Sequence, residues 1–162
     1  MDLPSAWNLY DKTTYLSVDS NGLRVNYEGS GEYNEVGGIR ANHPIPPQCK
    51  LFYFEIDIID EEINKWIGIG FCEKVFDLNR MHEWKDSSWG YQVSYDYFFC
   101  SERRPNRYGL SYSTGDTIGC CLNFKHNTVL YTKNGICLGI ITFRNLKDNL
   151  YPCVGLQRKV DL

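Results

Sequence analysis

Apolar and polar positions alternate with a period of two along several stretches of this chain. Within residues 51–59 the apolar side chains fall on the even-numbered positions from Phe52 to Ile58. Successive side chains of a β-strand point to opposite faces, so this pattern predicts a strand with one face in the core and one in solvent. Residues 66–71 follow as a further apolar strand with glycines on one face.

A second group of strands is predicted in the C-terminal half. Residues 117–124 alternate in the same way, and residues 128–132 and 136–141 are two further short apolar segments. Asn134 and Gly135 lie between the last two segments. This pair favours a type I′ turn, because both central residues of that turn need a positive φ. The sequence therefore predicts a β-hairpin here.

Residues 73–84 are the only stretch with any helical spacing. Their apolar residues are loosely spaced and no capping box precedes them, so we expect a loop with one short turn. Strands and turns otherwise follow one another regularly. We predict an all-β fold, a two-layer antiparallel β-sandwich formed by a single domain over residues 1–162.

Composition and charge agree with this fold and narrow the function. Aromatic residues make up 15% of the chain, and there are 14 glycines. Aromatic residues favour pleated surfaces and glycines favour tight turns. The formal charge is −3 and there is no basic block, so we expect no nucleic-acid partner. No apolar run approaches the ~20 residues that span a bilayer, and the first residues do not resemble a signal peptide.

The seven cysteines predict free thiols. Their number is odd and no CxxC pair occurs, which argues against a disulfide framework and against a zinc site. We expect them to be buried as small hydrophobic residues. Free thiols are typical of a reducing compartment, so we expect a cytoplasmic protein, with the nucleus as a second location.

The search for catalytic chemistry gives no candidate. The chain has three histidines, at positions 43, 82 and 126, and no sequence pattern pairs any of them with a nucleophile. Residues 109–113 resemble a nucleophile elbow but lack its closing glycine. The acidic residues near 57–62 are not arranged in the glycine-containing loop that a calcium site requires. We expect no enzyme activity, no metal and no cofactor.

Aromatic residues in predicted loops are the remaining candidates. Tyr33, Trp84, Tyr95 and Tyr97 lie in such loops. Tyrosine and tryptophan dominate interface hot spots because they offer a large contact area for little lost side-chain entropy. Each could instead be a structural plug, so the choice between surface and core stays open for each residue.

Seven segments together resemble the SPRY (B30.2-type) domain. The resemblance extends in order over nearly the whole chain. It is greatest for the SPRY domains of the Ran-binding protein M family, whose members are scaffold subunits of GID/CTLH ubiquitin ligases. The segments are GIRANHPIP (38–46), FYFEIDII (52–59), WIGIGF (66–71), SSWGYQ (87–92), TGDTIGCCLNF (114–124), YTKNGICLGIITF (131–143) and NLYPCVGLQ (149–157).

This resemblance implies a concanavalin-like jelly roll of two curved sheets, whose loops at one rim bind short peptide segments of other proteins. It implies protein partners, among them ubiquitin-ligase subunits or substrates, and a monomeric domain. It also implies that Trp89 and Tyr91 belong to the core. Carried over by position, the partner-binding residues are Tyr33, Asn34, Glu35, Arg40, Met81, Trp84, Lys85, Tyr95, Asp96 and Tyr97.

The chain departs from the family pattern in three places. The loops over residues 29–38 and 93–109 are its own, and the chain stops short of the asparagine, phenylalanine and glycine that usually close the last strand. We therefore expect a domain excised from a longer protein. Three alternatives remain open: a secreted host-targeting protein on the same fold, a carbohydrate-binding sandwich, and a hydrolase with a Cys–His pair.

Overall fold

The computed structural model describes residues 2–29, 36–46, 48–59, 65–80, 88–92, 97–100, 103–107, 113–142, 146 and 149–158. These residues form antiparallel sheets, and the only helical element among them is the single 3-10 turn η1 (Leu78–Arg80). The prediction of an all-β fold is confirmed. The prediction of a loop with one short turn is confirmed for residues 73–80, and residues 81–84 lie outside the described part.

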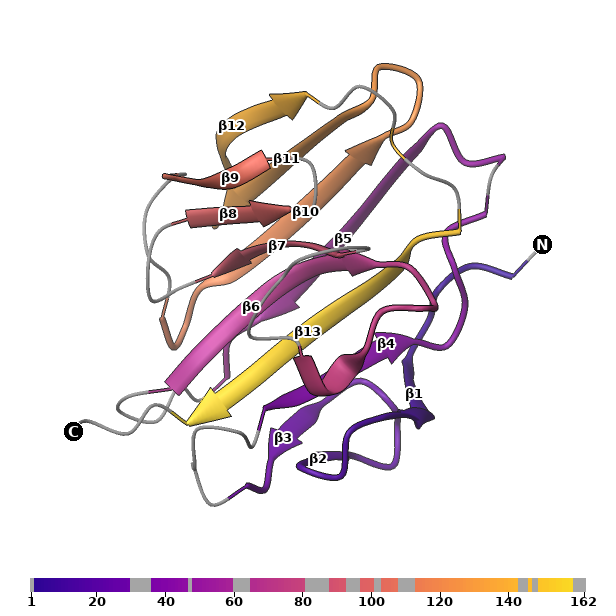
Figure 1. Ribbon diagram of the computed structural model, residues 1–162, viewed down its shortest axis with the longest axis vertical. Coiled ribbons are helices and arrows are strands. Elements are labelled where there is room, and N and C mark those ends of the chain that lie inside the picture. Colours follow the sequence, from indigo (N-terminus) through magenta and orange to yellow (C-terminus); the bar gives the residue numbers. More distant parts are fainter. Residues whose placement is uncertain are drawn as a thin grey trace.

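The larger sheet has the strand order β1-β4-β13-β6-β7-β8-β9 in the part of the chain that the structure describes. Its central strands β6 and β13 cross the middle of Figure 1. The bounds are β1 Trp7–Lys12, β4 Gly37–Ala41, β6 Lys65–Cys72, β7 Ser88–Gln92, β8 Tyr97–Cys100, β9 Arg103–Arg107 and β13 Tyr151–Arg158.

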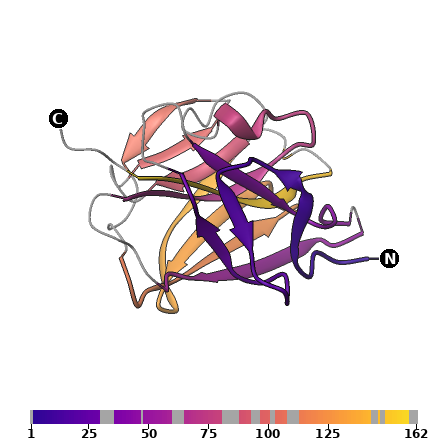
Figure 2. The ribbon, with the colours of Figure 1, turned by 90° about the horizontal axis from the view of Figure 1, so that it is seen from below.

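The smaller sheet has the order β12-β11-β10-β5 and packs against the larger one as a second layer (Figure 2). A separate two-stranded sheet, β2 with β3, lies near the N-terminus. The bounds are β2 Leu16–Val18, β3 Val25–Tyr27, β5 Leu51–Asp57, β10 Thr117–Asn123, β11 Thr128–Lys133 and β12 Ile136–Thr142.

Period-two alternation produces the core as predicted. In β5 the odd-numbered residues are exposed and the even-numbered ones are half-buried. In β10 the side chains of Ile118, Cys120 and Leu122 are fully buried. They pack in one cluster with Ile69 and Phe71 of β6, so the core lies between the two sheets. Apolar burial of this kind is the main stabilising contribution to the fold.

One buried hydroxyl connects the two layers directly. Tyr131 of β11 has no exposed surface, and its Oη donates a hydrogen bond of 2.9 Å to the backbone carbonyl of Ile69 in β6. A buried hydroxyl needs such a partner, because leaving it without one costs about 1–3 kcal/mol. The bond fixes the position of β11 relative to β6.

The predicted hairpin between β11 and β12 is confirmed. Asn134 and Gly135 have φ values of 51° and 83°, as a type I′ turn requires. The Asn134 side chain also accepts a hydrogen bond from the backbone amide of Thr117 and donates one to Asp116. The turn is therefore fastened to the start of β10 as well as closed by its own backbone.

Candidate functional site

Most of the predicted partner-binding residues lie outside the described part of the chain. This group comprises Tyr33, Asn34, Glu35, Met81, Trp84, Lys85, Tyr95 and Asp96. Tyr97 is the first residue of β8, where its backbone pairs with Gln92 and Arg107. Arg40 is described in full. The residues that flank the three loops show where each loop joins the sandwich.

One transverse row of the larger sheet joins the flanks of two of these loops. Residues 33–35 lie just before β4, close to Gly38 of this row, and residues 93–96 connect Gln92 to Tyr97. Since the residues that flank both loops lie in or next to this row, the two loops are attached at the same end of the sheet. In strand order, the paired residues of the row are Gly38, Gly155, Gly68, Gln92 and Tyr97.

A small buried cluster brings the third loop to the first. The chain leaves β6 at Cys72, and the segment 73–80 packs on β4. Phe76 and Leu78 of this segment join Val36, Cys72 and Cys153 in a cluster separate from the main core. Val36 follows residues 33–35 directly, and η1 precedes residue 81 directly. The start of the loop that contains Trp84 is thus anchored beside the end of the loop that contains Tyr33.

Arg40 holds the segment 73–80 in this position. Its guanidinium Nε donates to the backbone carbonyl of Glu73 at 3.2 Å, and Nη2 donates to the carbonyl of Phe76. Nη1 donates to the carboxylate of Asp11 in β1 at 2.9 Å. The donors of a guanidinium lie in one rigid plane, so Arg40 can serve three acceptors in a fixed arrangement, whereas the three donors of an ammonium group rotate on a flexible stem.

Asp11 extends this arrangement to the surface. Its second oxygen lies 2.8 Å from the Lys74 ammonium, which also lies 5.6 Å from the centre of the Tyr151 ring. The segment 73–80 is therefore held to β1, β4 and β13 by connected ion pairs, hydrogen bonds and a cation–π contact.

The structure gives Arg40 a structural position. The residue is 2% exposed, and its donors serve Asp11 and two backbone carbonyls. Such a side chain shapes the base of the loops, and its burial does not support a direct contact with a partner. No local sequence pattern indicates this role, because Asp11 is 29 residues away from Arg40 in the chain.

The cysteines agree in part with the sequence prediction. Cys72, Cys120 and Cys153 are buried free thiols, and burial raises the pKa of Cys120 and Cys153 above the ordinary thiol value. Cys49 and Cys121 are half-buried. Cys137 is exposed, so the prediction of burial was wrong for it: a register shift in the pairing of β12 with β11 accompanies its placement opposite Thr132 on the solvent side. Cys100 lies in β8, where side chains are not described.

Two features are absent from the described residues. Among them no group of three or more His, Cys, Asp and Glu side chains is arranged to hold a metal ion. No described helix has the length and hydropathy to cross a lipid bilayer.

Comparison with known proteins decides the family. The SPRY domain family matches residues 51–162. The chain belongs to the SPRY family. SPRY domains mediate protein–protein interactions and are not typically catalytic, so protein interaction is the general function that the fold supports.

Ran-binding proteins are among the relatives of this SPRY domain. It is 42% identical over 156 residues to Ran-binding protein 10 of Danio rerio, covering 96% of this chain and 26% of that protein. It is also 42% identical to Ran-binding protein 9 of Homo sapiens, covering 96% of this chain and 21% of that protein. The Ran-binding protein M homolog of Arabidopsis thaliana is 29% identical over 158 residues, with 96% and 34% covered. The chain spans about a quarter of the length of the first of these relatives.

Solved structures show the same fold. The SPRY domain of human HERC1 superposes with a TM-score of 0.75 at 18% identity, covering 97% of this chain and 99% of that one. A crystal structure of a human SPRY domain gives a TM-score of 0.70 at 23% identity, covering 92% and 98%. At these identities the likeness concerns the fold alone.

Proposed function

We propose that this SPRY domain binds short peptide segments of partner proteins through its rim loops. On this proposal it is the substrate- or adaptor-recognition part of a ubiquitin-ligase-type scaffold in the cytoplasm or nucleus. The residues that contact the peptide come from the loops that contain Tyr33, Trp84 and Tyr95. Free thiols at six described cysteines are compatible with a reducing compartment.

The observation that carries the proposal is the placement of residues that flank the three loops. Two of them join the larger sheet along the row from Gly38 to Tyr97, and the third begins beside Val36. Rigid strands and a buried ion pair hold these attachment points. A binding surface built on such a base loses little conformational entropy when a peptide binds, which favours affinity.

The proposed affinity comes from a few aromatic anchors. Trp84→Ala is expected to weaken peptide binding about thirtyfold, or about 2 kcal/mol, as removal of an interface hot spot does. Tyr33→Ala is expected to weaken it by a smaller factor. Tyr10→Ala is the matched control, because Tyr10 in β1 is 96% exposed and belongs to none of the three loops.

The experiment is a binding titration with peptides selected from an array by the wild-type domain, together with thermal unfolding of each variant. The proposal requires Trp84→Ala to lose affinity while its melting temperature stays near that of the wild type. An early-melting Trp84→Ala variant that still binds in its folded fraction would place Trp84 in the core and overturn this assignment.

The ligase role is tested on the whole protein. Immunoprecipitation of the full-length protein is expected to recover ubiquitin-ligase subunits, with Trp84→Ala reducing the recovery of substrates or adaptors but not of those subunits. If no ligase subunit is recovered, the scaffold part of the proposal fails, and the peptide-binding part is judged by the titration alone.

A further inference from the structure

In the part of the chain that the structure describes, the smaller sheet ends in an open strand edge at β5. Among the described strands, β5 pairs only with β10, and it is the last strand of its sheet. An edge strand offers a row of backbone donors and acceptors to any extended chain that lies beside it.

The backbone hydrogen bonds at the two ends of β5 show which residues face that edge. At one end of β5 the amide and carbonyl of Ile58 bond to Asp116 and Gly115, and at the other end the carbonyl of Lys50 accepts from Phe124. Even-numbered residues therefore direct their backbone groups toward β10. Because the direction alternates along a strand, the backbone groups of Glu55 and Asp57 point to the open edge.

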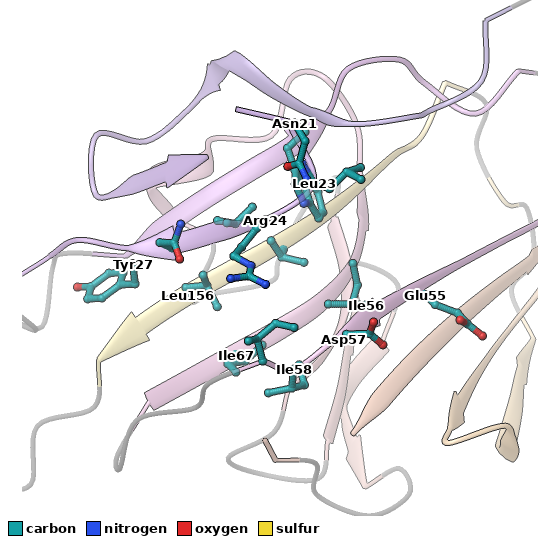
Figure 3. Close-up of a pocket in the computed structure, with 15 residues that line it drawn as sticks. Asn21, Leu23, Arg24, Tyr27, Glu55, Ile56, Asp57, Ile58, Ile67 and Leu156 are labelled. Carbon is teal, nitrogen blue, oxygen red and sulfur yellow. The ribbon is translucent and has the colours of Figure 1, made fainter. Parts of the chain in front are cut away.

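A pocket of about 740 Å³ lies along this edge. Glu55 to Ile59 form one wall, and Leu23 and Arg24 lie across from them, with Ile67 of β6 and Leu156 of β13 between (Figure 3). The volume is in the range of ligand-binding pockets, roughly 300–1,000 Å³. The pocket thus combines apolar side chains, among them Ile67 and Leu156, with the open backbone groups of β5.

Both charges that β5 contributes to this edge are negative, whereas Arg24 across the pocket is a cation that pairs with Asp19 at 3.7 Å. Glu55 and Asp57 are exposed, and their side chains point to the solvent face of the sheet. Each carboxylate accepts one hydrogen bond from a hydroxyl, Glu55 from Tyr53 and Asp57 from Thr117. Among the side chains that the structure describes, neither carboxylate has an ion-pair partner.

We infer that β5 is a second protein-binding surface, which takes an extended segment of a partner in which basic and apolar residues alternate. The segment adds to the sheet through the backbone groups of Glu55 and Asp57. In an added strand, the residues directly opposite Glu55 and Asp57 point to the same solvent face as these two side chains. A lysine or arginine at either position therefore lies beside a carboxylate. The residues between them point inward, where Ile56 and Leu156 offer an apolar surface. This surface is separate from the rim loops and does not depend on their proposed function.

The test uses the blocked peptide acetyl-Lys-Val-Arg-Val-Lys-amide and NMR of the labelled domain. We expect saturable binding and slowed hydrogen exchange at the amides of Glu55 and Asp57. The same residues in the order Val-Val-Lys-Arg-Lys break the alternation and are expected to bind at least about fivefold more weakly. Methylating the amide nitrogens of the peptide is expected to abolish binding, because the added strand can no longer donate to the edge.

Two double variants of the protein distinguish the effect of the charges on β5 from the effect of the net charge of the domain. Glu55→Gln combined with Asp57→Asn is expected to weaken binding about tenfold, since two opposite-charge cross-strand pairs are lost. Asp2→Asn with Glu28→Gln removes the same charge at two exposed positions that do not line the pocket, and is expected to change affinity less than about twofold. Trp84→Ala is expected to leave this binding unchanged.

Four results would overturn the inference. They are no binding, binding that protects other amides, equal affinity for the two residue orders, and equal weakening by the two double variants. Weakening by Trp84→Ala would assign the peptide to the rim loops instead.

Discussion

Arg40 and Asp11 form a largely buried ion pair, with Nη1 of the arginine 2.9 Å from Oδ1 of the aspartate. Their side chains are 3% and 19% exposed. The pair connects β4 to β1, and the remaining guanidinium donors hold the segment 73–80 against β4. One residue thus sets the position of a segment that leads into a proposed binding loop.

Arg40→Ala is expected to destabilise the domain by about 3 kcal/mol, because it leaves the Asp11 carboxylate and two backbone carbonyls without their donor. Urea unfolding measures this loss. Arg24→Ala is the control, since its pair with Asp19 is exposed and spans 3.7 Å, and it is expected to cost less than about 1 kcal/mol. Equal costs for the two variants would contradict the structural role of Arg40.

Tyr131→Phe is expected to lower the free energy of unfolding by about 1–2 kcal/mol. The change removes the hydroxyl that donates to Ile69 and leaves that buried carbonyl without this donor. Chemical unfolding measures the loss, and Tyr10→Phe, at a 96% exposed position, is expected to change nothing. If Tyr131→Phe were neutral, the bond between the two sheets would not contribute to stability.

Asp116 predicts a pH dependence of stability. Hydrogen bonds from Asn134 and from the backbone amide of Ser113, with a smaller contribution from Lys133, lower the pKa of Asp116 below the ordinary value. A carboxyl group whose pKa is lower in the folded state stabilises the fold above its unfolded pKa of about 4 and loses that contribution as the pH falls through the folded pKa.

Asp116→Asn is therefore expected to cost about 1 kcal/mol at neutral pH, and the difference from the wild type should shrink as the pH falls below about 4. Unfolding curves across this range measure it, with Asp2→Asn as the exposed control. A difference that stays constant with pH would show that charge at Asp116 is irrelevant.

Cys137 is expected to react first with a thiol reagent in the native state. It is exposed, whereas Cys72, Cys120 and Cys153 are buried and burial raises the pKa of Cys153 and Cys120. Cys137→Ser is expected to remove the fast phase of labelling, and Cys153→Ser to leave it intact. Fast labelling that survives Cys137→Ser would point to a different accessible thiol.

The sequence indicated the strands that alternate cleanly, because period two is a local property. Residues 51–59 and 117–124 became β5 and β10 with the predicted faces, and Asn134-Gly135 became the predicted turn. The SPRY-like motifs also occur along the chain in the same order as in the family, so the family could be predicted without coordinates.

Tertiary structure alone decided which residues meet across the chain. Arg40 looked like a binding residue beside a loop, yet a carboxylate 29 positions earlier pairs with it in the interior. The open edge of β5 depends on which strand ends its sheet, and no strand pattern specifies its neighbours. Pairing between distant segments is set by packing of the whole chain, and that information is absent from any short stretch of sequence.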